Sequence, residues 1–316
     1  MRNILILSTL LISFVVCNIN PPLFNYASNP REEGELKGVI GIMVEFAEEI
    51  SDDPLTSGNG RFLTSNPDVS FIDNENINRC SETLLDPPPH NIEYFESQIE
   101  AAKNYFNTIS NSNIDFDYHM ISTVYQVNST MASYAQSEND ITRLYIESII
   151  EAEDEIVHQA ELKDWGSDDF LVVVFHAGLG QEAGSGNALF DATVYDIHSA
   201  YIDESMIASM HNVYSDEYSM CSNGTCTFDS VLDSEPYVVN NGILLPETLN
   251  SIYFDTIEDM YPVTLVEEDE LENIFCEAQA GITGLFAYLL GYRLGLPVMH
   301  RTENIQPVTR IGKFGL

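Results

Sequence analysis

Tyr288 and Tyr292 lie four residues apart in the apolar stretch GITGLFAYLLGYRLGLP, residues 281–297. If this stretch is a helix, the spacing puts both phenol groups on one face, one turn apart, where a pair of metal ligands would stand. A phenol has an ordinary pKa of about 10, so it is a poor metal ligand at neutral pH. Leu289 cannot accept a proton at all. The residues by themselves therefore predict an apolar core helix without chemistry of its own.

The stretch DDFLVVVFHAGLGQEAGSGN, residues 168–187, holds two further candidates. His176 ends an apolar strand over 170–175, and Glu182 follows in a glycine-rich loop. A buried, hydrogen-bonded role in the scaffold is favoured for each. A dinucleotide site is not indicated, because no Gly-x-Gly-x-x-Gly pattern opens a helix there. His158, among acidic residues, is expected to be solvated at the end of a helix.

The cysteines are informative once the compartment is considered. Removal of an N-terminal segment that includes Cys17 leaves four, an even number, which suits an oxidising environment. Cys221 and Cys226 flank an Asn-Gly turn, so a small disulfide loop is predicted. A metal site is the alternative, but this spacing without a second Cys or His pair is a poor zinc motif. A bond between Cys80 and Cys276 follows only by elimination.

The charge balance excludes one class of partner. The chain carries 50 Asp and Glu against 12 Lys and Arg, a formal net charge of -38. Such a surface repels phosphate backbones, so nucleic acid is not expected as a partner. Calcium is a candidate ion, with oxygens from Asp73 and Glu75 or from Asp52 and Asp53. None of these has the EF-hand pattern, so solvated loops are the favoured interpretation.

The N-terminus predicts export. A short positive start is followed by the apolar run ILILSTLLISFVVC, which is too short to span a bilayer comfortably. Residues 1–17 are therefore interpreted as a secretory signal peptide, and lipid attachment at Cys17 is the weaker interpretation. No later segment predicts a membrane span. We expect a secreted protein with no membrane contact after removal of the signal.

Patterns along the chain predict one domain of strands and helices, residues 37–316, after a leader over 18–36. Apolar runs and alternation predict strands, and helical spacing of apolar residues predicts helices. The strands are expected within 37–46, 113–127, 168–187 and 242–251, and the helices within 86–107, 138–160 and 281–294. The expected fold class is α+β.

Several blocks of the sequence resemble secreted zinc metallopeptidases of the immune inhibitor A type. The zinc helix of that family reads His-Glu-Phe-Gly-His-x-Leu-Gly-Leu-Pro-Asp, and the present chain ends its apolar helix with the same Gly-Leu-Pro. The resemblance is collinear over about residues 37–316. The further blocks that carry it are VIGIMVEF, TSGNGRF, PPPHNIEYFESQIEAAKNYFNTISNSNIDFDYHM, VVVFHAGLGQEAGSGN, DIHSAYI, NGILLPETLN and RIGKFGL.

The resemblance implies a zincin-like domain, with a twisted mixed sheet packed on helices and an active-site helix over 281–294. Alignment on Gly-Leu-Pro puts Tyr288 and Tyr292 at the two histidine positions, Leu289 at the position of the general base and Val298 at that of the third ligand. All four catalytic positions are changed. The resemblance therefore implies a domain that has lost its zinc and its catalytic activity, a pseudopeptidase. The resemblance also puts His176 and Glu182 in a block beside the cleft, as candidate cleft residues.

Such a domain can still hold an extended peptide or protein segment against a sheet edge, because that recognition uses backbone hydrogen bonds and pockets. One alternative is an active metalloendopeptidase with an atypical metal site, for which His300 or Glu303 would have to supply ligands. Another is a nonfunctional fragment, because family members continue beyond the position of Leu316 and the lower subdomain is expected to be incomplete.

Overall fold

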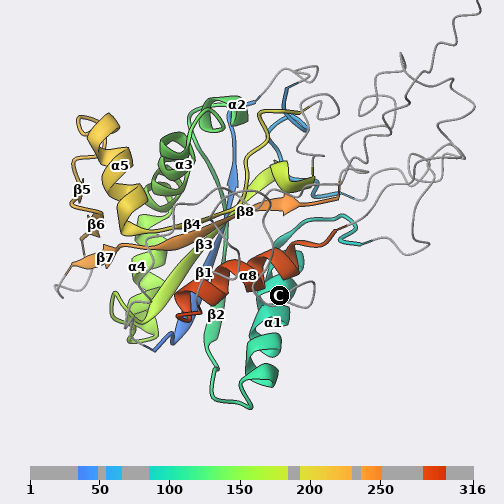
Figure 1. The fold of residues 1–316 in the computed structure, drawn as a ribbon, viewed down its shortest axis with the longest axis vertical. Helices are drawn as coiled ribbons and strands as arrows, with labels where there is room; N and C mark the ends of the chain where they lie inside the picture. The colour runs from blue at the N-terminus through green and yellow to red at the C-terminus, as the bar shows by residue number, and fades with distance from the viewer. Residues whose placement is uncertain are drawn as a thin grey trace, which may run out of the picture.

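The structure is a computed structural model. It describes residues 35–48, 55–65, 85–183, 193–229, 236–250 and 280–296. This part of the chain has an α+β fold with a mixed sheet and helices, as the sequence predicted (Figure 1).

Several sequence predictions fall outside the described residues. These are the signal peptide 1–17, the leader except Glu35 and Leu36, the pair Cys80 and Cys276, the acidic residues Asp52, Asp53, Asp73 and Glu75, and Val298, His300 and Glu303.

A five-stranded sheet forms the centre of the described part, in the order β2-β1-β3-β8-β4. Its strands are β1 (Gly38–Glu45), β2 (Asp117–Gln126), β3 (Phe170–Leu179), β4 (Ala200–Ile202) and β8 (Gly242–Thr248). Neighbouring strands are parallel except that β4 runs antiparallel to β8 at one edge. Every residue of β3 and β8 is buried, which explains why these strands read as continuous apolar runs.

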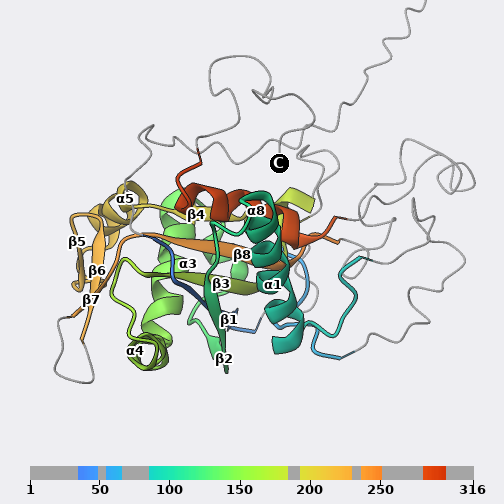
Figure 2. The same ribbon diagram turned by 90° about the horizontal axis from the view of Figure 1, so that it is seen from below.

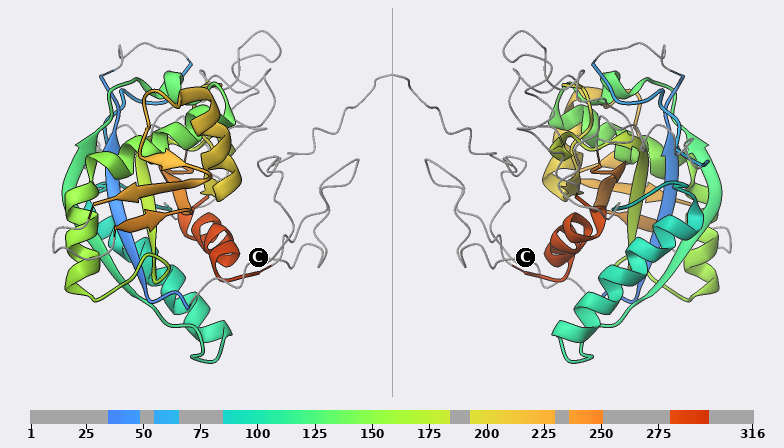
Figure 3. Two further views of the ribbon diagram at one scale, coloured as in Figure 1. Left: turned by 90° about the vertical axis from the view of Figure 1, so that its left-hand side faces the viewer. Right: turned by 90° about the vertical axis from the view of Figure 1, so that its right-hand side faces the viewer.

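Helices cover both faces of this sheet (Figures 1 and 3). On one face Phe175 of β3 contacts Phe95 of α1 (Ile92–Ile109) and Phe286 of α8 (Ile282–Arg293). Figure 2 shows α1 and α8 side by side over this face. On the other face lies α3 (Glu138–Glu151), whose Tyr145 packs so closely under Gly242 that a Cβ there would lie 1.9 Å from the phenol oxygen.

The helix predicted within 86–107 is present as α1, and it begins after the prolines of this stretch. Residues 85–91 are not helical, and α1 starts after Asn91, whose side chain accepts a hydrogen bond from the amide of Tyr94 at 3.1 Å. Asparagine is a strong N-cap because its oxygen satisfies an amide that lacks an intrahelical partner. None of the described helices is both long and apolar enough to cross a membrane.

The prediction of a single helix over 138–160 is wrong, because the structure has two helices there. The first is α3, and Ala152 separates it from α4 (Glu153–Leu162). Acidic side chains are unfavourable at the C-terminal end of a helix and favourable at its N-terminus. The break places Glu153, Asp154 and Glu155 in the first turn of a new helix, where the helix dipole stabilises them. His158 is exposed on α4, as expected.

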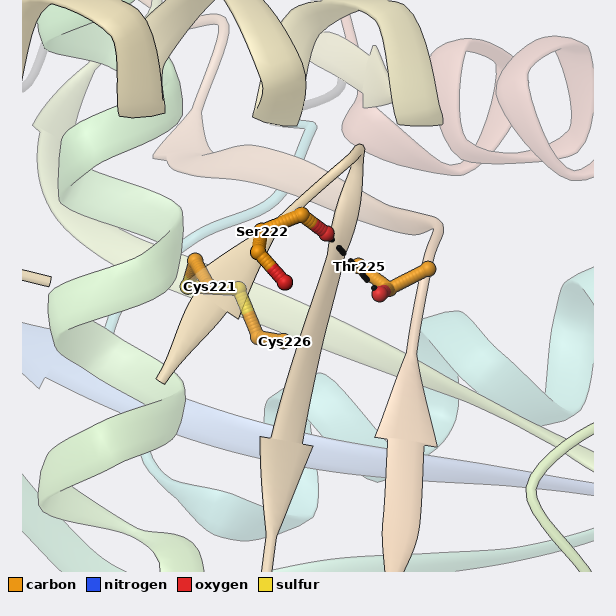
Figure 4. The surroundings of a disulfide bond; sticks show 4 residues. All are labelled: Cys221, Ser222, Thr225 and Cys226. Carbon is orange, nitrogen blue, oxygen red and sulfur yellow. Dashed lines mark hydrogen bonds between the residues drawn. A yellow bond between two sulfur atoms is a disulfide. The ribbon is translucent and has the colours of Figure 1, made fainter. Parts of the chain in front are cut away.

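A small three-stranded sheet carries the predicted disulfide. It consists of β5 (Cys221–Ser222), β6 (Thr225–Phe228) and β7 (Tyr237–Val239), beside α5 (Glu204–Tyr214). Cys221 and Cys226 are bonded across the β5–β6 hairpin and are completely buried (Figure 4). Asn223 and Gly224 both have positive φ, which a two-residue hairpin turn requires. The prediction of this disulfide is confirmed.

Candidate functional site

The apolar helix predicted over 281–294 is present as α8, which packs against α1, β8 and the edge strand β4. Its inner side is part of the core, where Phe286, Leu289 and Leu290 are completely buried. Tyr288 and Tyr292 are only half-buried, so they lie on the side of the helix that reaches solvent. The helix thus presents to solvent the two tyrosines that the sequence analysis singled out.

These two tyrosines form an aromatic cluster with a third from the sheet. The Tyr292 hydroxyl donates a hydrogen bond to the Tyr288 oxygen, and the two rings lie 5.2 Å apart at 80°. The ring of Tyr201, in β4, lies 5.8 Å from that of Tyr292 at 45°. Partial burial raises the pKa of both α8 tyrosines above the ordinary value for phenol. At neutral pH Tyr288 and Tyr292 are therefore uncharged. We call Tyr201, Tyr288 and Tyr292 the tyrosine cluster.

The donor atoms at this position do not fit the zinc ion that the family resemblance implies. Zinc takes neutral imidazole, thiolate or carboxylate ligands, whereas Tyr288 and Tyr292 offer neutral phenols that bond to each other. Leu289 lies inside the core and has no atom that could accept a proton from bound water. Among the residues that the structure describes, no group of three or more His, Cys, Asp or Glu could hold a metal ion.

A buried polar network fixes the start of α8. Glu247 of β8 and His90 are both completely buried, and a Glu247 carboxylate oxygen lies 2.6 Å from His90 Nδ1. The other ring nitrogen of His90 lies 2.8 Å from the carbonyl oxygen of Asp86. The Asp86 carboxylate in turn accepts a hydrogen bond from the Ile282 amide at 3.0 Å. An acceptor with negative charge is favourable at this N-terminus, so the network ties α8 to the sheet.

Glu247 also binds two backbone amides. One carboxylate oxygen accepts a hydrogen bond from the Leu63 amide at 2.6 Å, and the other accepts one from the Gly178 amide at 2.9 Å. Three separate segments thus depend on one buried carboxylate. Burying a charge is unfavourable unless it is paired and hydrogen-bonded, and Glu247 meets both conditions.

The other end of α8 is held by a buried arginine. Arg293 is 3% exposed, and its guanidinium donates to the Asp168 carbonyl oxygen at 2.6 Å. Asp168 lies just before β3, so this contact joins the last turn of the helix to the beginning of a central strand. With both ends attached, the orientation of Tyr288 and Tyr292 is determined by contacts far apart in the sequence.

The structure separates His176 from this helix. Side chains alternate along a strand, and Phe175 points toward α8, so His176 points to the opposite face. There its ring contacts Phe46 at 5.8 Å and its Nδ1 lies 2.9 Å from the Ala177 carbonyl oxygen. Complete burial lowers the pKa of His176 to about 4. It is a neutral core histidine, and it is not brought together with Tyr288 or Tyr292.

Glu182 lies nearer to the edge strand. One of its carboxylate oxygens accepts a hydrogen bond from the amide of Ser199, the residue before β4, at 2.6 Å. The other oxygen is enclosed by protein. Burial raises the pKa of this carboxyl above its ordinary value. Glu182 thus fixes the position at which β4 begins, which is a structural role.

The sequence analysis did not single out Tyr201, His90 or Glu247. For Glu247 a signal exists, because this charged residue directly follows the apolar run GILLP and would have to be paired if the strand is buried. Nothing in the sequence pairs it with His90, which lies 157 residues away. No family model and no curated protein matches this sequence.

Proposed function

We propose that this chain is a secreted metallopeptidase-like domain that has lost catalytic zinc chemistry and binds extended peptides beside α8. The observation that carries the proposal is the identity and environment of Tyr288, Leu289 and Tyr292. They occupy the positions that the family resemblance gives to two zinc ligands and a general base, and their side chains supply two neutral phenols and a buried hydrocarbon.

The arrangement of the sheet supports a zincin-like architecture. Four strands are parallel, and the short strand β4 runs antiparallel at the edge beside α8. The predicted active-site helix and the long helix α1 share the same face of the sheet. A core that draws on all five strands and on α1, α3 and α8 favours a folded domain over a nonfunctional fragment.

The position of β4 supports peptide binding. Among the described strands, β4 is the last strand of the sheet and pairs antiparallel with β8. An extended segment can add to such an edge through main-chain hydrogen bonds, while neighbouring side chains select its sequence. The tyrosine cluster lies immediately beside this edge, since Tyr201 belongs to β4 itself. The same place can therefore provide both backbone pairing and side-chain contacts.

Zinc stoichiometry, measured by elemental analysis of the purified 18–316 chain after dialysis against trace zinc, tests the loss of metal chemistry. We expect a ratio near zero and no hydrolysis of casein. The matched variant restores the family motif with Tyr288→His, Leu289→Glu, Tyr292→His and Val298→Asp, and it should bind about one zinc ion. A ratio near one in the unchanged chain contradicts the loss of zinc. A ratio near zero in the restored variant contradicts the zincin-like geometry.

Peptide binding is tested separately by amide hydrogen exchange with an added casein digest as the source of extended peptides. Exchange in 200–202 should slow when peptides are present, whereas exchange in β2 at the opposite edge should not change. Unchanged exchange at β4 would contradict the binding role.

A further inference from the structure

We propose that Asn128 and Asn223 carry N-linked glycans, added while the chain passes through a secretory route. The inference rests on export, which is part of the proposed function, and it adds two covalent modification sites. Each glycan joins the side-chain amide nitrogen of asparagine to the anomeric carbon of an oligosaccharide supplied on a lipid diphosphate. The bond from that carbon to the phosphate oxygen breaks, the lipid diphosphate leaves, and the amide nitrogen gives up one proton.

The acceptor pattern for this modification occurs twice in the sequence. It consists of asparagine, any residue except proline, and then serine or threonine. The two matches are Asn128-Ser129-Thr130 and Asn223-Gly224-Thr225, and both have threonine at the third position. The pattern alone does not make a site, because a glycan is bulky and must extend into solvent. The position of each asparagine in the fold is therefore the deciding observation.

Asn128 lies in the turn that follows β2, and its side chain is exposed. The backbone beside it is held in place, because the Ser129 carbonyl oxygen accepts a hydrogen bond from the Ala47 amide at 3.1 Å. A bulky group on the Asn128 side chain therefore does not require the backbone to move. The strands β2 and β4 lie at opposite ends of the sheet order, so this site belongs to the edge away from the proposed peptide-binding edge.

Asn223 is the first residue of the two-residue turn between β5 and β6, in the hairpin that the disulfide closes (Figure 4). Its side chain is exposed as well. The next residue, Gly224, is buried against α5, where a Cβ would lie 2.6 Å from the Glu204 carbonyl oxygen. The folded hairpin therefore leaves room for a glycan on Asn223, although it encloses the middle of the acceptor pattern.

The two sites differ in the reaction that competes with their modification. An enzyme that must contact all three residues of the pattern can do so at Asn223 only before Gly224 packs against Glu204. Cys221 and Cys226 are separated by five positions, and a loop this short closes quickly, so the disulfide can form before the rest of the domain folds. Once formed, it holds the pattern in the turn. We therefore expect a higher glycan occupancy at Asn128 than at Asn223.

The test is expression of the full chain in mammalian cells, with protein collected from the cells and from the medium. Peptide N-glycosidase F in water labelled with oxygen-18 converts each glycan-bearing asparagine to a labelled aspartate, which mass spectrometry of peptides then counts. We expect label at both sites, and Thr130→Ala or Thr225→Ala should each remove one glycan while keeping the asparagine. Asn104→Gln, which changes an exposed asparagine outside the pattern, is the control and should keep both glycans.

The competition with the disulfide is tested by Cys221→Ser combined with Cys226→Ser. The labelled fraction of Asn223 should rise in this variant, and that of Asn128 should stay the same. An unchanged fraction at Asn223 contradicts the competition. Occupancy is counted on peptides, so the result does not depend on whether the variant folds.

Failure of the inference and failure of export give different results. A second version of the chain carries an established secretion signal in place of residues 1–17. A site that stays without label in this second version overturns the proposal for that site, whatever the natural N-terminus does. Label in the second version but not in the natural chain supports both sites and contradicts export by the chain's own N-terminus.

Discussion

Two groups of tyrosines, both built around helices, differ in how they are positioned. Around Arg143, Tyr134 and Tyr218 donate to the Glu147 carboxylate, and Tyr214 donates to Asp140. Because Asp140, Arg143 and Glu147 are three and four residues apart on α3, the charged centre of this group is local to one helix. The tyrosine cluster at α8 instead combines one helix with a strand that lies 87 to 91 residues earlier in the chain.

The comparison teaches that the two groups depend on different parts of the sequence. The Arg143 group has its cation and its carboxylates within ten residues of α3. The cluster at α8 is oriented by contacts at both ends of the helix, through Asp86 at the start and Asp168 at the end. Damage to a distant buried residue should therefore disturb the second group more than the first.

The largest loss of folding stability is expected from Glu247→Leu. This change leaves His90 and the amides of Leu63 and Gly178 without their buried acceptor, and breaking a buried pair costs about 3–5 kcal/mol of unfolding free energy. Urea denaturation measures this loss. NMR signals of Tyr288 and Tyr292 should shift more than those of Tyr134 and Tyr214. Glu100→Leu, which changes an exposed glutamate on α1, serves as the control, and a loss below 1 kcal/mol in Glu247→Leu would contradict the support role.

A smaller loss of folding stability is expected from protonation of His176 at low pH. His176 lies on the same face of the sheet as the Arg143 group, and Phe46 contacts both Tyr134 and His176 there. Burial lowers the pKa of His176 from 6.5 to about 4. As pH falls from 6.5 to 4 the unfolded chain binds a proton that the folded chain does not, so stability decreases by about 3 kcal/mol from this residue.

His176→Leu should remove that part of the pH dependence, as measured by urea denaturation at several pH values. His158→Gln, which alters an exposed histidine on α4, should leave it unchanged. If the unfolding free energy of the His176→Leu variant depends on pH between 6.5 and 4 as strongly as that of the unchanged chain, His176 does not lie in a core that excludes water.

The smallest loss of folding stability is expected from changes at Arg143. Arg143→Met removes the guanidinium from the faces of Tyr134 and Tyr214 and removes the ion-pair partner of Glu147, which should lower the unfolding free energy by about 2 kcal/mol. Arg143→Lys should cost less than methionine, since it keeps the charge and loses the stacked plane. Equal stability of all three proteins in thermal unfolding would show that this cation contributes nothing to the fold.

Much of the fold could be predicted because local signals were strong. The continuous apolar runs predicted β1, β3 and β8, and the Asn-Gly turn between two cysteines predicted the disulfide loop. The break at Ala152 was missed because apolar spacing continues through it, while the acidic side chains that favour a new helix start act through the helix dipole. At the candidate site, α8 and its two tyrosines were predicted, and Tyr201 was not.

The sequence by itself determined the residue types at the centre of α8, and with them the chemistry of the donors, because a phenol or a leucine has the same atoms in any fold. It also determined the spacing that puts Tyr288 and Tyr292 one turn apart. Only the tertiary structure decided that Tyr201 joins them, that His176 faces away and that Glu247 meets His90. Those relations depend on the order of strands and on which face each side chain takes, and both are settled by packing between segments far apart in the chain.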